Sequence, residues 1–230
     1  VAGYTYSNDG DATGFHGIWD YWVVKLDIAG NKQWDKVFGG IDYEDPEIVE
    51  VTKDGGYIIG GNSSSGIGFD KTQPTWGGAD CWILKLDSAV NKQWDGNYGG
   101  FGDEQVYSIK QTRDNGYIFG GFSTSDAGGD KTDSLRGMVD YWIIKIDSTG
   151  NKQWDRAYGG NGKDYLTVVE QSSDGGYIVG GYSNSNNNGD KTQPNWDTTL
   201  ITYDYWVLKL DSTGNKLWDR AFGGTSNEEL

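Results

Sequence analysis

The clearest hydrophobic pattern in the chain is a short alternating run. Trp142, Ile144 and Ile146 occupy one set of alternate positions, while Tyr141 and Ile143 begin the other set. A period of two places side chains on both faces of a β-strand. The repeating unit around this run has no stretch with the period of an amphipathic helix, so the pattern predicts an all-β protein.

One unit of about sixty residues predicts four strands separated by turns and one long polar loop. The Arg113-Asp114-Asn115-Gly116 turn after the first strand is typical of a β-hairpin. The long loop separates the second strand from the third. The expected strands are Gln105–Thr112, Tyr117–Ser123, Tyr141–Asp147 and Lys152–Tyr158.

The same unit recurs along the chain, as three sequence markers show. An Asp-Tyr-Trp-like run returns in steps of 60, 60 and 64 residues, beginning at Asp20, Asp80, Asp140 and Asp204. A Gly-Asn-Lys-Gln-Trp-Asp-like run ends at Asp35, Asp95, Asp155 and Asp219. A Gly-Tyr-Ile run begins at Gly56, Gly116 and Gly176. Four strands per repeat favour a blade of a β-propeller over a solenoid coil, because solenoid repeats are usually shorter.

The order of these motifs, from Asp-Gly-Gly-Tyr-Ile through Gly-Gly-Tyr-Ser and Asp-Tyr-Trp-Ile-Lys to Gly-Asn-Lys-Gln-Trp-Asp, resembles bacterial β-propeller repeat proteins. It is similar to the repeat arrays of secreted and surface proteins of Bacteroidota and, more distantly, to the seven-bladed propeller repeat called SBBP. The resemblance covers nearly the whole chain. It implies a propeller fold and a secreted or cell-surface location, and it implies little about a ligand.

The repeat phase predicts the domain organisation of a single propeller domain. Residues 1–40 correspond to a partial blade that lacks its first strand, residues 41–100, 101–160 and 161–224 to three blades, and residues 225–230 to the start of another first strand. We expect the chain to be part of a larger ring and to have further repeats of the same chain as neighbours.

Composition and charge narrow the class of protein. Eleven Trp and 15 Tyr indicate a core of large aromatic side chains rather than disorder, and 37 Gly with 3 Pro indicate many tight turns. The net charge of −15 argues against binding to nucleic acid or to an anionic membrane surface. No run of residues is long and apolar enough to predict a membrane-spanning helix.

One acidic series lies in the long loops, where an Asp follows a stretch rich in Ser, Asn and Gly. Its members are Asp11, Asp70, Asp130 and Asp190. Such loops offer the side-chain and backbone oxygens that calcium prefers, although the spacing differs from an EF-hand. The alternative is an Asx-turn, in which each carboxylate caps nearby backbone amides.

A second acidic series starts the first strand of each repeat, just after a Gly-Gly pair. Its members are Glu44, Glu104, Asp164 and Glu228. In a propeller the first strands line the central channel, so these carboxylates would ring its mouth and hold a cation. The alternative is that each caps the amides of a turn in the neighbouring blade.

Three tryptophans fall outside the repeated strand positions: Trp19, Trp76 and Trp196. Trp76 and Trp196 lie six residues beyond Asp70 and Asp190, while the third repeat has Arg136 near the same place. Exposed indoles beside polar side chains suit glycan or protein binding, and the alternative is that they cover the edge of a blade.

The catalytic inventory is small. His16 is the one histidine, so a histidine-based triad or a His cluster for zinc is not expected. Cys81 replaces the Tyr of the other repeats and is expected to be structural. The 34 acidic residues leave room for a glycosidase pair, but one active site would break the repeat symmetry.

The sequence therefore predicts a non-catalytic, secreted or cell-surface propeller that binds a glycan or a surface protein on its long-loop side, with calcium as a loop ligand. The alternative is a structural spacer without a ligand, and a polysaccharide-active enzyme is a third hypothesis.

Overall fold

The fold is built of fifteen β-strands in a computed structural model that describes residues 1–197 and 199–228; these residues contain no helix. The strands form four antiparallel sheets, and within each sheet the spatial order follows the chain. Sheet 1 holds β1 (Ala2–Thr5), β2 (Asp20–Leu26) and β3 (Lys32–Phe38). Sheet 2 holds β4 (Glu44–Val51), β5 (Tyr57–Ser63), β6 (Asp80–Leu86) and β7 (Lys92–Tyr98). Sheet 3 holds β8 (Glu104–Gln111), β9 (Tyr117–Ser123), β10 (Asp140–Ile146) and β11 (Lys152–Tyr158). Sheet 4 holds β12 (Asp164–Gln171), β13 (Tyr177–Ser183), β14 (Asp204–Leu210) and β15 (Lys216–Phe222).

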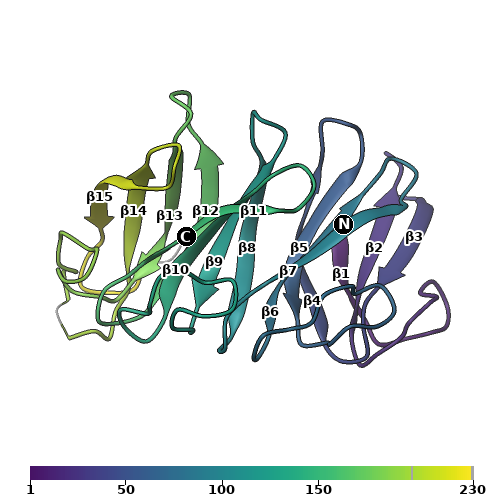
Figure 1. Ribbon diagram of the computed structural model, residues 1–230, viewed down its shortest axis with the longest axis horizontal. Coiled ribbons are helices and arrows are strands. Elements are labelled where there is room, and N and C mark those ends of the chain that lie inside the picture. The colour runs from purple at the N-terminus through teal and green to yellow at the C-terminus, as the bar shows by residue number, and fades with distance from the viewer. Residues whose placement is uncertain (198, 229–230) are drawn as a thin grey trace.

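The sheets stand side by side in chain order, and Figure 1 shows them as a row from purple to yellow. The all-β repeat architecture expected from the sequence is therefore confirmed. Two of the four strands expected in the third repeat have the observed bounds, and the other two differ by one residue at each end. The row does not close into a ring within the described residues.

The alternating pattern of β10 places its two faces in two different cores. Trp142, Ile144 and Ile146 pack with residues of sheet 2, whereas Tyr141 and Ile143 pack with residues of sheet 4. Each inner sheet is thus buried on both faces, and the sheets associate face to face. The tryptophan of the third strand recurs in each repeat because it fills the same place between two sheets. Trp82, Trp142 and Trp206 are at most 1% exposed.

A bulge in each first strand explains the Gly-Gly pairs of the second strands. The pairing of β8 with β9 shifts between Val106 and Ser108, opposite Gly121 and Gly120. A Cβ at Gly121 would lie 1.9 Å from the Gln105 carbonyl oxygen, so only glycine fits there. The same shift occurs in the β4–β5 and β12–β13 pairs.

Candidate functional site

The long connections between the second and third strands gather on one side of the row, named here the long-loop face. They comprise residues 6–19, 64–79, 124–139 and 184–203. The first three loops are tied to the link that leads into the next sheet, because the amides of Ile18, Gly78 and Met138 donate hydrogen bonds to carbonyls of that link. Figure 1 shows these loops along the lower side, opposite the tight hairpins.

One aspartate at the end of each repeat anchors the long loop and explains three sequence motifs together. Asp155 accepts hydrogen bonds from the Thr132 amide at 2.9 Å, the Trp142 indole at 3.1 Å and the Lys152 ammonium at 2.9 Å. Burial acts to raise the pKa of Asp155, but these hydrogen bonds outweigh it and lower the pKa. The Asp-Lys-Thr, Asp-Tyr-Trp and Asn-Lys-Gln-Trp-Asp motifs therefore meet at one buried carboxylate. Asp95 and Asp219 make the equivalent contacts.

The first acidic series is engaged by protein donors from other elements. Asp11 pairs with Lys32 at 2.8 Å, and Asp70 accepts the Gly39 amide at 3.2 Å. Asp130 accepts the Trp76 indole N–H at 2.9 Å. Asp190 accepts the Gly159 amide at 3.3 Å and pairs with the Arg136 guanidinium at 2.5 Å. The contacts of Asp70, Asp130 and Asp190 join their loops to the preceding repeat, whereas Asp11 pairs within its own sheet. The amide contacts of Asp70 and Asp190 resemble the capping alternative, but each spans 31 residues of chain.

Each member of the second acidic series caps a backbone amide in the short link that directly precedes it in the chain. The Glu104 carboxylate, which is completely buried, accepts the Gly100 amide at 2.6 Å and the hydroxyls of Ser123 and Ser125, both at 2.6 Å. Glu44, Asp164 and Glu228 accept the equivalent amides of Gly40, Gly160 and Gly224. The carboxylates thus hold the turn from one sheet into the next, rather than a turn of the neighbouring repeat.

A third carboxylate series, which the sequence reasoning treated only as part of a motif, lies beside the second. Asp20, Asp80, Asp140 and Asp204 are completely buried, and one oxygen of each has no hydrogen-bond partner. A Cβ at Gly159 would lie 2.2 Å from Asp140 Oδ1 and 3.0 Å from Asp164 Oδ2, so the glycine Cα–H fills the space between the two carboxylates. Burial raises the pKa of Asp80 and of Asp140 to about 6.

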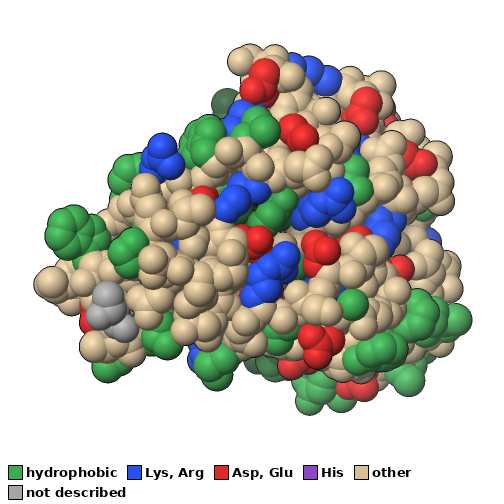
Figure 2. Space-filling view, turned by 60° about the vertical axis from the view of Figure 1, so that its left-hand side comes forward, with side chains coloured by type: hydrophobic (Ala, Val, Ile, Leu, Met, Phe, Trp, Pro, Cys, Tyr) green, Lys and Arg blue, Asp and Glu red, His purple; other side chains and the backbone are tan. Residues whose placement is uncertain are grey.

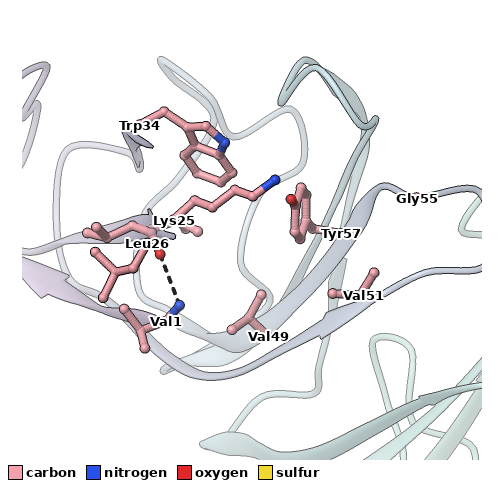
Figure 3. A pocket seen from close by; sticks show the side chains of 10 residues that line it. Val1, Lys25, Leu26, Trp34, Val49, Val51, Gly55 and Tyr57 are labelled. Carbon is pink, nitrogen blue, oxygen red and sulfur yellow. Dashed lines mark hydrogen bonds between the residues drawn. The ribbon is translucent and has the colours of Figure 1, made fainter. Parts of the chain in front are cut away.

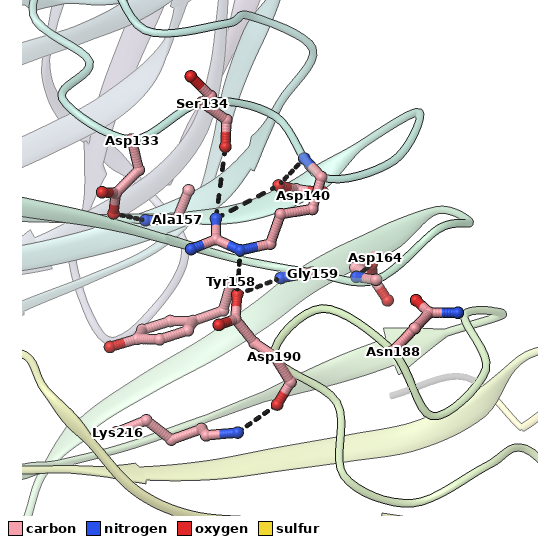
Figure 4. A network of polar contacts seen from close by, with 12 residues as sticks. Asp133, Ser134, Asp140, Ala157, Tyr158, Gly159, Asp164, Asn188, Asp190 and Lys216 are labelled. Atoms are coloured by element: carbon pink, nitrogen blue, oxygen red, sulfur yellow. Dashed lines mark hydrogen bonds and ion pairs between the residues drawn. The ribbon is translucent and has the colours of Figure 1, made fainter.

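The unpartnered oxygen of Asp140 faces Gly159, while its other oxygen accepts the Arg136 amide at 2.9 Å. The Arg136 guanidinium bridges Asp140 and Asp190. Figure 4 shows Lys216 reaching the Asp190 carbonyl from the other side of Asp190. Among the described residues, no group of three or more His, Cys, Asp and Glu side chains is arranged to hold a metal ion. The calcium sites remain a prediction.

Position 136 belongs to a series that the sequence reasoning recognised only in part. The amides of His16, Trp76, Arg136 and Trp196 donate to Asp20, Asp80, Asp140 and Asp204, respectively, at 2.7–2.9 Å. The side chains of the first three reach the loop aspartate of the next repeat, with His16 Nδ1 at 4.0 Å from Asp70 Oδ2. The signal in the sequence is the spacing before the Asp-Tyr-Trp motif, which is four residues for His16, Trp76 and Arg136 and eight residues for Trp196.

Trp76 forms the best-defined exposed aromatic group on the long-loop face. Its residue is 49% exposed, its indole is oriented by Asp130, and its ring lies above Gly129. Phe101, 67% exposed, lies next to Gly128 in the same place. Two glycines without side chains therefore support two exposed rings.

The other two predicted aromatic residues differ from Trp76. Trp19 stacks on Tyr4 at a centroid distance of 4.7 Å and meets Tyr43 edge-on, so it covers the end of sheet 1. Trp196 is 70% exposed and lines a small pocket with Pro194 and Asn195.

Further large hydrophobic side chains are exposed in the long loops and links. They include Tyr6, Ile18, Ile41, Ile67, Phe69, Met138 and Ile201. Figure 2 shows hydrophobic side chains gathered along the lower edge, where the long loops lie, and charged side chains across the middle. An exposed apolar surface of this kind marks a binding face more often than single exposed residues do.

Cys81 and His16, two side chains of types that often act in catalysis, pack against other residues of the fold. Cys81 is a buried free thiol whose pKa is raised by burial. The His16 ring lies against Phe69 at a centroid distance of 4.5 Å and faces the Asp20 and Asp70 carboxylates.

Comparisons with known proteins are sparse. No family model matches the chain, and no curated protein matches it. Among solved structures, the chain is similar to a protein of unknown function from Bacteroides caccae, with 10% identity and a TM-score of 0.34. The similarity covers 89% of this chain and 77% of that one. Within the described residues, no helix has the length and apolar character needed to cross a membrane.

Proposed function

We propose that the four sheets are blades of a β-propeller that binds a glycan through the long-loop face, as a non-catalytic module of a secreted or cell-surface protein. Contacts between the first strands β4, β8 and β12 support the propeller arrangement, since these strands would face a common axis. The motif resemblance to bacterial surface repeat arrays supports the location.

The observation that carries the binding proposal is the Trp76–Phe101 pair. A fixed, half-exposed indole offers a flat apolar face to a sugar ring, and its N–H is already satisfied by Asp130. A rigid aromatic surface loses little conformational entropy on binding.

A glycan array followed by calorimetry on the best ligand tests the proposal. We expect Trp76→Ala to weaken binding at least about tenfold, the size of effect typical when a central aromatic contact is removed. Trp218→Ala is a matched control, because Trp218 is a similarly exposed indole, at 42%, on the outer sheet rather than in the loops. No glycan bound, or an equal loss in both variants, would overturn the proposal and favour a structural spacer.

Calcium is tested in the same preparation. A calcium ion that binds the folded chain but not the unfolded chain raises the melting temperature of the protein as the calcium concentration increases. A melting temperature unchanged by calcium and by chelator would contradict the calcium part of the proposal, because the loop aspartates would then serve only their protein donors.

A further inference from the structure

A lysine is buried in three of the four long loops. Lys71, Lys131 and Lys191 each follow an aspartate of the first acidic series, and each is 1–2% exposed. The sequence reasoning treated them only as part of the Asp-Lys-Thr motif. A buried amine has no water around it and depends on the acceptors that the protein supplies. The chemistry of the three lysines therefore differs according to those acceptors.

The acceptors of Lys191 include a buried carboxamide, that of Asn195. The Lys191 amine donates to the Ser183 hydroxyl at 3.1 Å and to the Ser185 carbonyl at 2.9 Å. Its third contact is Asn195 Oδ1. Asn195 Nδ2 in turn donates to the carbonyls of Ser183 at 2.7 Å and Thr202 at 3.2 Å, which fixes the end of the carboxamide that faces the lysine. The carbonyl carbon Cγ thus lies one bond beyond the atom that Lys191 contacts.

A buried carboxyl group, Asp164, is connected to Lys191 through one hydroxyl. Ser183, whose hydroxyl accepts from Lys191, is also hydrogen-bonded to Asp164. The Ser185 hydroxyl donates to the same carboxylate at 2.9 Å. Asp164 is completely buried, and among the carboxylates it attracts the charge of Lys191 most strongly. Ser183 therefore offers a path for a proton between the amine and the carboxyl group.

Burial favours the neutral forms of both groups. Loss of hydration lowers the pKa of Lys191 to about 8 and raises the pKa of Asp164. A proton therefore passes from Lys191 to Asp164 at a lower free-energy cost than between the same groups in water. The neutral amine that remains is a nucleophile, whereas the ammonium is not.

The other repeats keep the buried lysine but have no carboxamide at the position of Asn195. Its counterparts are Thr75 in the second repeat and Leu135 in the third. Lys71 donates to the Ser63 hydroxyl at 2.8 Å, which is the equivalent of the contact of Lys191 with Ser183. The lysine is thus a repeated feature of the loop, and its pairing with a carboxamide occurs in the fourth repeat.

Lys25, in sheet 1, is a lysine in the opposite surroundings. Figure 3 shows its side chain between Trp34 and Tyr57 in an open groove. Lys25 is exposed, and none of the side chains that line the groove is a carboxamide. It therefore has neither the burial nor the acyl partner of Lys191.

We propose that Lys191 and Asn195 join in an intramolecular isopeptide bond. The Lys191 ammonium gives one proton through the Ser183 hydroxyl to Asp164, and the neutral amine attacks Asn195 Cγ. The Nζ–Cγ bond forms, the Cγ–Nδ2 bond breaks, and one hydrogen moves from Nζ to Nδ2, which leaves as ammonia. Ammonia takes the proton back from Asp164 and departs as ammonium. No oxidant or other reactant is needed, because the acyl group is only transferred from one nitrogen to the other.

The effect of this bond is local. It closes a ring over residues 191–195 alone, and so short a ring removes little entropy from the unfolded chain. It fixes the segment directly before Trp196, which is 70% exposed on the long-loop face and whose amide is held by Asp204 at 2.9 Å. The bond forms whether or not that face binds a glycan, since no ligand takes part in the reaction.

Mass spectrometry of the purified, folded chain tests the proposal. We expect the intact chain to be lighter than its sequence requires by one ammonia. Digestion with trypsin after unfolding locates the bond, because trypsin does not cleave after a lysine whose amine is acylated. Residues 164–209 are therefore expected as one uncut peptide, lighter by one ammonia.

Asn195→Thr is the matched control, because it gives the fourth repeat the residue that the second has at Thr75. This variant should have its full mass, and trypsin should release residues 192–209 as a separate peptide. Lys191→Met removes the amine and should also have its full mass. A full mass for the unmutated chain, or release of residues 192–209 from it, would overturn the proposal even if neither variant folds. A missing ammonia in Asn195→Thr would overturn it as well, by placing the loss at another side chain.

Discussion

At the residue scale, the pKa of a buried carboxylate in this protein depends on the hydrogen-bond donors and charges around it. Asp155 is surrounded by an amide, an indole and an ammonium group, which favour its charged form. Asp140 has one amide and a distant guanidinium, and it lies beside a second carboxylate, Asp164. The two environments move the pKa values in opposite directions, so the two groups contribute oppositely to the dependence of stability on pH.

Replacing Asp140 by Asn is expected to stabilise the protein at pH 8. The pKa of Asp140 is raised to about 6, chiefly by burial, so the folded chain holds this proton more tightly than the unfolded chain. The unfolding free energy therefore falls as the pH rises from the ordinary carboxyl pKa to about 6. Asn keeps the hydrogen bond to the Arg136 amide without the buried charge. We expect a gain on the order of 1–3 kcal/mol at pH 8, measured by urea unfolding.

The gain should shrink as the pH is lowered to 4, where Asp140 is protonated in the folded chain. Asp147→Asn is the control of opposite sign. Asp147 accepts the Thr149 amide at 2.8 Å and the Asn151 amide at 2.9 Å, and hydrogen bonding lowers its pKa. That variant should lose stability at pH 8. An Asp140→Asn variant no more stable than the parent at pH 8 would contradict the expectation.

At the element scale, each sheet depends on a bulge that brings a carbonyl against a glycine. The bulge lets the first strand bend while the second strand stays in register with the third, as the unbroken pairing of β9 with β10 shows. The Gly-Gly pair in the repeat is thus a packing requirement of the sheet rather than a turn or a phosphate-binding loop.

Gly121→Ala is expected to lower the unfolding free energy by at least about 2 kcal/mol, because the added methyl would overlap the Gln105 carbonyl and separate β8 from β9. Chemical denaturation measures the loss. Gly66→Ala is the matched control, since a Cβ at Gly66 meets no atom within 4 Å. Equal stability of the two variants would show that the strands relax around the methyl group.

At the scale of the whole molecule, the row is held by face-to-face packing of neighbouring sheets. Each of the three hydrophobic clusters joins residues of two adjacent sheets. A sheet removed from its neighbours would expose its tryptophans and isoleucines, so we expect the sheets to unfold together rather than one at a time.

Cys81 reports on this cooperativity, because it is the one thiol and lies 2% exposed in the cluster between sheets 2 and 3. We expect iodoacetamide to label it only at the rate of global unfolding, with the same denaturant dependence. Mass spectrometry of the labelled chain measures the rate, and tryptophan fluorescence measures unfolding in parallel. Labelling much faster than unfolding, with little denaturant dependence, would mean that this interface opens separately.

Much of the fold follows from local patterns. The period of two, the Asp-Gly turns and the sixty-residue repeat are properties of neighbouring residues, and they predict the strands and the asymmetric loop face closely. Trp142 and Tyr141 lie in different hydrophobic clusters on opposite faces of β10, as the period of two predicts. The number of strands in each repeat and their order in the sheet also follow from the sequence, since consecutive strands joined by turns pair with their neighbours in the chain.

The partners of the polar groups were decided only by the tertiary structure. Asp130 meets an indole 54 residues earlier in the chain, and Asp95 gathers a threonine, a tryptophan and a lysine from three segments. Such contacts depend on register and on packing between sheets, which local periodicity does not contain. The sequence by itself determined which residues form strands and loops. The tertiary structure decided which carboxylates are buried and that the rings of Trp76 and Phe101 remain exposed on the long-loop face.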